Sequence, residues 1–104
     1  MTIRNIKKPD QQWHVQAVAG IFKSLADPTR LRILLWLKAG ERCVHELCAS
    51  MGMSQPAVSH QLRILRVARL VSSERKGREI FYSIKDEHVM KLVDAALAHA
   101  SEHA

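Results

Sequence analysis

The chain has 104 residues, with 16 Lys and Arg against 10 Asp and Glu and a formal net charge of +6 at pH 7. This length fits one domain with a modest core, and the charge favours a polyanionic partner, although basic surfaces also serve solubility or membranes. No run of about 18 apolar residues, no apolar signal core and only two cysteines are present, so we expect a cytoplasmic protein that neither spans a membrane nor relies on disulfides.

The N-terminal quarter divides into an arm and a helix. Residues 1–10 are polar and charged, and we expect them to form a flexible arm ahead of a single folded domain over residues 11–104. From Trp13 to Leu25 apolar residues recur at a spacing of four, which places them on one helical stripe. This spacing predicts a first helix over residues 11–25.

A second helix is predicted directly after the first. Asp27 can cap the free amides of its first turn, and Pro28 suits that turn because its missing N–H would have no partner there. Gly40 is expected to end the helix. The residues expected to face the core are Leu31, Leu34, Leu35 and Leu37.

The next two helices have the spacing of a helix-turn-helix motif. A short helix is predicted over residues 43–50 and is closed by Gly52, and Ser54 is expected to cap a longer helix with Pro56 near its first turn. The connecting residues 50–53 have the length of a helix-turn-helix turn. The buried stripe of the longer helix is expected to comprise Val58, Leu62 and Leu65.

Beyond these helices the apolar period changes to two. Residues 70–74 and 80–84 are predicted strands, joined by a basic connection over residues 75–79 in which Gly77 permits the turn. Asp86 is expected to open a last helix. Its apolar side is expected to comprise Val89, Leu92, Val93, Ala96 and Ala100. Four helices, a hairpin and a helix predict a mainly α domain with a β-hairpin, which is a winged helix-turn-helix.

Polar and basic side chains on the second helix of the motif and on the hairpin are candidates for DNA contacts. The N-terminal part of such a helix lies in the major groove, where Gln can bond adenine twice and Ser and His can donate to base or phosphate acceptors. Arginines further along suit phosphates, and a basic hairpin tip suits the backbone or the minor groove. The candidates are Gln55, Ser59, His60, Arg63, Arg66, Lys76 and Arg78.

The last predicted helix contains four candidate metal ligands, which are Asp86, His88, His99 and Glu102. Carboxylate oxygens and imidazole nitrogens are ligands that zinc takes in proteins. His88 and His99 are roughly three whole turns apart, so they share one helix face but lie about 16 Å apart along the axis. Because zinc–nitrogen bonds are only about 2 Å long, one helix cannot close the site. An antiparallel copy could, and a symmetric dimer would then hold two such sites.

Two segments resemble the ArsR/SmtB family of metal-responsive repressors. Residues 24–34, SLADPTRLRIL, are similar to the second helix of that family, and residues 54–62, SQPAVSHQL, are similar to its recognition helix. The resemblance covers about residues 17–104. It implies a homodimeric winged helix, with N- and C-terminal helices in the dimer interface, that binds an operator when metal-free and leaves it on metal binding.

The resemblance also implies where the metal binds. All four candidate ligands match the family's zinc site on the paired C-terminal helices, and His103, four residues after His99, is an alternative to Glu102. The same ligands would accept cobalt or nickel. The family pattern further implies that His99 reaches a backbone carbonyl near Arg69, at the end of the recognition helix, and so transmits metal binding to DNA binding.

Cysteine-based sensing has less support in the sequence. The family's arsenic-type site needs Cys-x-Cys, whereas residues 43–45 read Cys-Val-His and supply one thiolate. His14, Cys43 and His45 form at most a remnant site. We expect Cys43 and Cys48 to pack as small apolar residues, with a thiol redox sensor through this pair as an alternative function.

The predicted function is a metal-sensing transcriptional repressor and not an enzyme. The sequence has no nucleophile–base arrangement and no phosphate-cradling loop, and a metal site filled by four protein ligands has no open position to activate water. One alternative is a metal-independent winged-helix regulator, in which His88 and His99 would be ordinary interface residues. Another is a metal-buffering protein without an operator.

Overall fold

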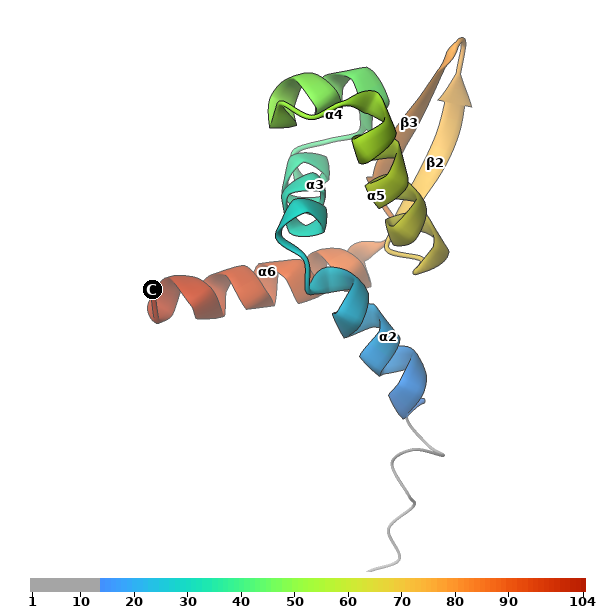
Figure 1. Cartoon of the computed structure of the whole chain (residues 1–104). Helices are drawn as coiled ribbons and strands as arrows, with labels where there is room; N and C mark the ends of the chain where they lie inside the picture. The colour runs from blue at the N-terminus through green and yellow to red at the C-terminus, as the bar shows by residue number, and fades with distance from the viewer. Residues whose placement is uncertain (1–13) are drawn as a thin grey trace, which may run out of the picture.

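The computed structural model describes residues 14–104. The predicted arm over residues 1–10 and the apolar Trp13 lie outside the described residues. The elements, in chain order, are α2 (Val15–Leu25), α3 (Pro28–Lys38), β1 (Arg42–Cys43), α4 (Val44–Met51), α5 (Gln55–Val67), β2 (Val71–Lys76), β3 (Glu79–Ile84) and α6 (Glu87–Glu102) (Figure 1). The predicted winged helix-turn-helix order of helices, hairpin and last helix is confirmed.

The predicted helix caps are made by side chains. The side chain of Asp27 accepts a hydrogen bond from the backbone N–H three residues later at 3.0 Å, that of Ser54 at 3.3 Å and that of Asp86 at 3.1 Å. Gly52 ends α4 at φ 62, in the left-handed region that favours glycine. These local signals fix where α3, α5 and α6 begin and how the chain turns between α4 and α5.

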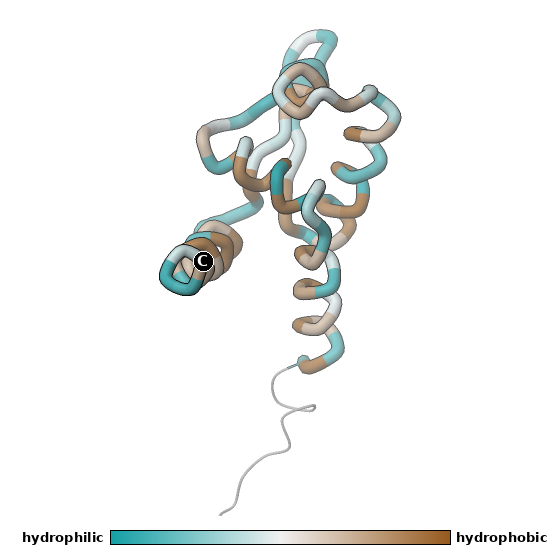
Figure 2. The backbone as a smooth tube through the Cα atoms, turned by 60° about the vertical axis from the view of Figure 1, so that its left-hand side comes forward, coloured by the Kyte–Doolittle hydropathy of each residue, from teal (hydrophilic) through white to brown (hydrophobic). Residues whose placement is uncertain are grey.

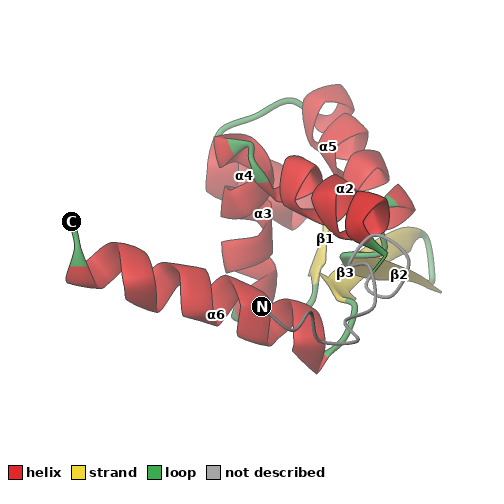
Figure 3. Ribbon diagram, turned by 90° about the horizontal axis from the view of Figure 1, so that it is seen from below, coloured by secondary structure: helices red, strands yellow, loops and turns green. Residues whose placement is uncertain are grey.

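The hairpin belongs to a three-stranded antiparallel sheet in the order β1-β3-β2. The strand β1, which has two residues and pairs with β3, was not predicted. The strands also extend further toward the tip than predicted, because Lys76 pairs with Glu79. The connection is therefore the two residues Gly77 and Arg78, with Gly77 at φ 67, and not residues 75–79. Figure 3 shows this hairpin at one end of the domain.

The core lies between α3, α4, α5, β2 and the first half of α6. The side chains that are almost fully buried are Ile33, Leu34, Leu47, Val58, Leu62, Leu65, Leu70 and Val71. The predicted stripe of α5 is confirmed, and so are Leu34 and Leu37. The prediction was wrong for Leu31 and Leu35, which are 38% and 40% exposed. They lie on a second apolar face of α3, while Ile33 completes the buried one.

That second face opens onto an apolar groove between α2, α3 and α6, with a volume of about 540 Å³. The groove is lined by Phe22, Leu25, Ala26, Leu31, Leu35, Leu92, Val93, Ala96, Leu97 and Ala100. Figure 2 shows apolar residues along both α2 and α6, and Figure 1 shows the far half of α6 extending away from the rest of the domain. No helix within residues 14–104 is long and apolar enough to cross a bilayer.

Candidate metal centre and nucleic-acid interface

Two of the candidate ligands lie at the start of α6. Asp86 caps the helix through Oδ1, which accepts from the Val89 N–H at 3.1 Å and lies 3.6 Å from Nδ1 of His88. The side chains of His88 and Asp86 are 86% and 47% exposed. Because Oδ1 is engaged by the helix amide, Oδ2 is the atom of Asp86 best placed to bind a metal ion.

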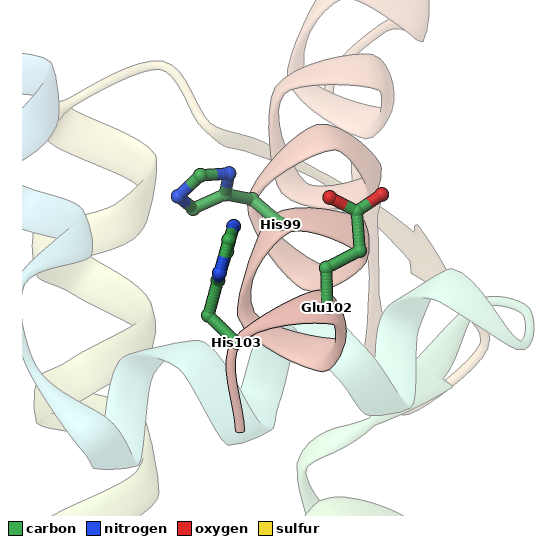
Figure 4. A group of neighbouring side chains, drawn as sticks. All are labelled: His99, Glu102 and His103. Carbon is green, nitrogen blue, oxygen red and sulfur yellow. The ribbon is translucent and has the colours of Figure 1, made fainter.

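The other candidates lie at the end of α6. His99, Glu102 and His103 are exposed, and one ligand atom from each lies within 4.8 Å of the others. The imidazole centroids of His99 and His103 are 4.6 Å apart, and Figure 4 shows the two rings side by side with Glu102 on the adjoining face. Two nitrogens on one ion are at most about 4.2 Å apart at bond lengths of about 2.1 Å. Small rotations of these side chains would suffice, so the group fits a divalent transition metal.

The two ends of α6 do not meet within one chain. His88 and His99 both lie within α6, and their eleven-residue separation corresponds to about 16 Å along the axis of a regular helix. In the described part of the chain, the group at the end of α6 is the one place where three His, Cys, Asp or Glu ligand atoms gather. A remnant site from His14, Cys43 and His45 is therefore not assembled.

A pocket of about 490 Å³ lies beside the first pair of candidate ligands. Asp86 and His88 form one part of its wall, and Val67, Ala68 and Arg69 at the end of α5 form another. Arg69 has a left-handed backbone, at φ 61. His99 belongs to the opposite end of α6, so the expected contact between His99 and a carbonyl near Arg69 would need the His99 of a second copy.

The candidate DNA contacts lie on α5 and the hairpin. Gln55 and Ser59 share the lining of a hollow of about 230 Å³ with Arg78 of the hairpin tip. These three residues are exposed, and so are His60 and Arg63 on α5. Figure 1 shows α5 lying alongside β2 and β3. The fold therefore brings the N-terminal part of α5 and the tip of the β2–β3 hairpin together on one exposed surface.

The two basic residues predicted at the hairpin tip differ in their surroundings. Lys76 lies in β2 and forms an ion pair with Glu41, which raises the pKa of the lysine. Arg78 lies in the turn itself. Arg66 is tied to the hairpin, since its Nη1 donates to Oγ of Ser73 at 3.4 Å. Arg78 is therefore better placed than Lys76 to give an unneutralised charge to a phosphate.

Arg30 makes a connection that was not predicted. Its Nε donates to the carbonyl oxygen of Ser24 at 2.6 Å, and its Nη1 donates to Oε1 of Gln61 at 3.1 Å. The guanidinium thus joins the end of α2 and the start of α3 to the middle of α5. No local pattern signals this contact, because Arg30 and Gln61 are 31 residues apart.

The cysteines pack against the protein interior, as predicted. Cys43 is 4% exposed and Cys48 is half-buried against the core. Burial raises the pKa of the Cys43 thiol, and hydrogen bonding to Glu79 and Glu46 adds to that rise. The backbone N–H of Cys43 also donates to Oε1 of Glu46 at 3.0 Å, which lowers the pKa of that carboxyl. A buried thiol with a raised pKa is a poor nucleophile, which weighs against redox sensing through Cys43.

Comparisons with known proteins agree with this architecture. Residues 27–73 match the family described as bacterial regulatory protein, arsR family. The chain is 49% identical over 87 residues to a transcriptional repressor SmtB homolog from Synechocystis sp., covering 84% of this chain and 66% of that protein. It is 50% identical over 86 residues to the HTH-type transcriptional regulator NmtR from Mycobacterium tuberculosis, covering 83% and 71%. The chain thus spans about two thirds of the length of these relatives.

A similar solved structure is a homodimeric winged helix-turn-helix DNA-binding domain from Mycobacterium bovis. It has a TM-score of 0.85 and 31% sequence identity, and the match covers 97% of this chain and 93% of that one. The helix-turn-helix geometry, the hairpin and the identities to curated regulators lead to the same assignment. This chain belongs to the ArsR family of bacterial regulatory proteins, and it is a DNA-binding transcriptional regulator rather than an enzyme.

Proposed function

We propose that this protein is a metal-responsive transcriptional repressor that binds operator DNA as a metal-free homodimer and is released by zinc, cobalt or a related divalent ion. The observation that carries the proposal is the division of the ligands between the two ends of α6. Asp86 and His88 lie at one end, and His99 lies with Glu102 and His103 at the other. Relatives named as repressors and metal-resistance regulators, such as the SmtB homolog and a cadmium-resistance regulatory protein, support a metal as the signal.

A second copy of the chain is the occupant that we propose for the groove between α2, α3 and α6. Phe22 and Leu97 on its walls are 54% and 36% exposed in the single chain, so covering the groove would remove apolar surface from water. An antiparallel pairing of two α6 helices would bring Asp86 and His88 of one protomer beside His99 of its partner. Two-fold symmetry would repeat this arrangement, giving two metal sites per dimer.

A bound divalent ion would supply a cross-link between the two α6 helices. Asp86 and His88 of one protomer, with the partner's His99 and Glu102, offer two imidazoles and two carboxylates, which suits four-coordinate zinc. The donor chemistry therefore supports a metal ion at this position.

The cross-link would reach the DNA-binding helix through the pocket beside Asp86 and His88. Val67 and Arg69, at the end of α5, line that pocket, so a partner helix drawn against it would press on the end of the recognition helix. We expect this to favour a spacing of the two recognition helices that fits the operator poorly. Thermodynamic reciprocity then requires that DNA weaken metal binding by the same factor.

The proposal is tested by titrating zinc into the purified dimer bound to fluorescent DNA from upstream of its own gene, following anisotropy. We expect release at a ratio near one zinc per chain, and no release for the double variant His88→Ala/His99→Ala. Tight DNA binding that zinc leaves unchanged would contradict metal sensing and favour a metal-independent regulator. Zinc binding without binding to any operator DNA would favour a metal-buffering protein.

The proposed dimer has its own test. Leu97→Asp puts a charge into the groove, at a residue that is not among the candidate ligands. We expect sedimentation to show a shift toward monomer, together with weaker metal and DNA binding, because both sites need two chains. Trp36→Asp, at an apolar residue that is 40% exposed on α3 and outside that groove, is the matched control. A Leu97→Asp protein that remains a full-affinity dimer would exclude the groove as the interface.

A further inference from the structure

We propose that the hollow between α4, α5 and the β2–β3 hairpin receives a phosphate group of the DNA backbone, and that His45 bonds this phosphate as a protonated imidazole held by Glu79. His45 was not among the predicted DNA contacts, but it lines the hollow together with Gln55, Ser59 and Arg78, which were. The inference rests on DNA binding by the metal-free protein and is independent of the proposed response to metal.

The hollow has the size and the donors to hold an anion. Its volume of about 230 Å³ is several times the roughly 30 Å³ that one water takes in the liquid. Arg78 supplies a permanent positive charge, and the hydroxyl of Ser59 and the amide of Gln55 supply neutral donors. All three residues are exposed, so a DNA strand can reach them. A guanidinium with neutral donors beside it suits the oxygens of a phosphate.

Glu79 is the residue of the hollow that does not suit an anion by itself. Its Oε1 lies 3.9 Å from Nε2 of His45, and the two side chains are 42% and 72% exposed. This distance is longer than a hydrogen bond, so the pair contributes little while no DNA is bound. A carboxylate repels a neighbouring phosphate unless a positive charge lies between the two anions.

His45 is placed to supply that charge. A protonated imidazole donates from both of its ring nitrogens, whereas a neutral one donates from a single nitrogen. Because Nε2 faces Glu79, Nδ1 is left to donate to a phosphate oxygen in the hollow. A carboxylate and a phosphate on either side of the ring both favour its charged form. We therefore expect each chain to take up a proton at His45 when it binds DNA.

The other charged or titratable groups around His45 do not change their charge near neutral pH. Arg78 is permanently charged, and the buried thiol of Cys43 has a raised pKa and stays neutral. Glu46 on α4 is engaged by the Cys43 N–H, which donates to Oε1 at 3.0 Å, and Arg42 on β1 lies near this carboxylate. The residues that α5 contributes to the wall are neutral. Since an ordinary imidazole changes its charge between pH 5 and 8, His45 sets the charge of the hollow in this range.

The test is the affinity of the full chain for fluorescent operator DNA in chelator, measured by anisotropy between pH 6 and pH 8. If a phosphate favours the charged imidazole by about tenfold, reciprocity makes the affinity up to about tenfold higher per chain at pH 6 than at pH 8. We expect this gain for the wild type and its loss in His45→Gln. At pH 6 the slope of log Kd against log salt concentration should be steeper for the wild type by about 0.9 per chain, and at pH 8 the two slopes should agree.

Two further variants separate the parts of the proposed site. Glu79→Gln removes the repulsion between carboxylate and phosphate, so it should bind DNA more tightly than the wild type at pH 8 and gain less at pH 6. His60→Gln is the matched control, because His60 is an exposed imidazole of α5 that does not line the hollow, and the gain at pH 6 should persist in this variant.

Several outcomes would overturn the inference. A gain at pH 6 that persists in His45→Gln, or one that His60→Gln abolishes, would exclude His45 as the group that takes up the proton. Weaker binding by Glu79→Gln at pH 8 would mean that the carboxylate does not oppose a phosphate. A gain seen with the operator but not with a duplex of scrambled sequence would mean a base contact, because phosphate contacts carry no sequence information. Since no metal is present, each of these results leaves the proposed metal response standing.

Discussion

Asp86 is a helix cap in this structure, and we also propose it as a metal ligand. Its Oδ1 accepts from the Val89 N–H at 3.1 Å, and its carboxylate is one of the two proposed metal donors at the start of α6. Asp86→Ala removes both the acceptor and the charge, and loss of an N-cap costs about 0.5–2 kcal/mol of folding free energy. Asp86→Asn keeps an acceptor oxygen and loses only the charge near the helix N-terminus, which costs about 0.3–1 kcal/mol. We therefore expect stability in chelator to fall in the order wild type, Asn, Ala.

The response to zinc should follow a different order. An ion that binds only the folded dimer stabilises it by about 2.7 kcal/mol at a free concentration about 100 times its Kd. We expect that gain for the wild type and its loss in both Asp86 variants. The matched control is Asp27→Ala, which removes the equivalent cap of α3, where Oδ2 accepts from the Arg30 N–H at 3.0 Å. This variant should lose cap stability but keep the full response to zinc.

The assay is denaturant unfolding followed by circular dichroism, with chelator or buffered zinc, at one fixed protein concentration because a dimer's stability depends on it. A full zinc response in Asp86→Asn would refute the ligand role of Asp86. Equal stability of the Asn and Ala variants in chelator would refute the cap. Loss of the zinc response in Asp27→Ala would mean that removing any helix N-cap abolishes metal binding. The cap and ligand roles of Asp86 could then not be separated.

Three further predictions concern the DNA surface, pH and the thiols. Arg78→Ala should weaken operator binding and reduce the slope of log Kd against log salt concentration by about 1. Lys76→Ala should reduce this slope less, because Glu41 already pairs with the lysine. Equal slopes for the two variants would contradict this prediction. Glu46 has a lowered pKa in the folded state, so its stabilising contribution is present above the ordinary value of 4.5 and is lost as the pH falls through the folded value. Acid unfolding of Glu46→Gln should therefore depend less on pH, and an unchanged profile would exclude the carboxylate. Alkylation of the native protein near pH 7, read by mass spectrometry, should modify half-buried Cys48 before Cys43, and the reverse order would revive a redox role for Cys43.

The elements predicted correctly are those specified by neighbouring residues. Asp27, Ser54 and Asp86 cap helices through bonds to amides three residues away, so the sequence alone locates them. The short β1 was missed because a two-residue strand has no period, and it exists only through its pairing with β3. The predicted connection at the hairpin tip was too long for the same reason, because the pairing of Lys76 with Glu79 depends on both strands.

For the candidate site as well, only features set by residues close in sequence could be predicted. The helical period is enough to predict that His88 and His99 share a face and cannot meet, and that His99 and His103 can. Contacts between distant segments had no local signal, as with the ion pair of Lys76 and Glu41, which are 35 residues apart. The misassigned Leu31 and Leu35 have a different cause. Apolar periodicity marks a buried face without telling whether the same chain or a second copy buries it.

Those two leucines also bear on how a signal at α6 could reach DNA. Leu31 and Leu35 place α3 in the wall of the proposed dimer groove, while Arg30 at the start of the same helix bonds to Gln61 of α5. A shift of the partner helix in the groove would therefore act on the recognition helix at its middle, as well as at its end beside Arg69. Arg30→Lys would keep the positive charge but lose the guanidinium group, which donates to Ser24 and Gln61 at the same time. If α3 carries part of the coupling between metal binding and DNA binding, this variant should bind zinc normally and release DNA less completely. If zinc releases DNA from the variant as it does from the wild type, the end of α5 is left as the sole route of coupling.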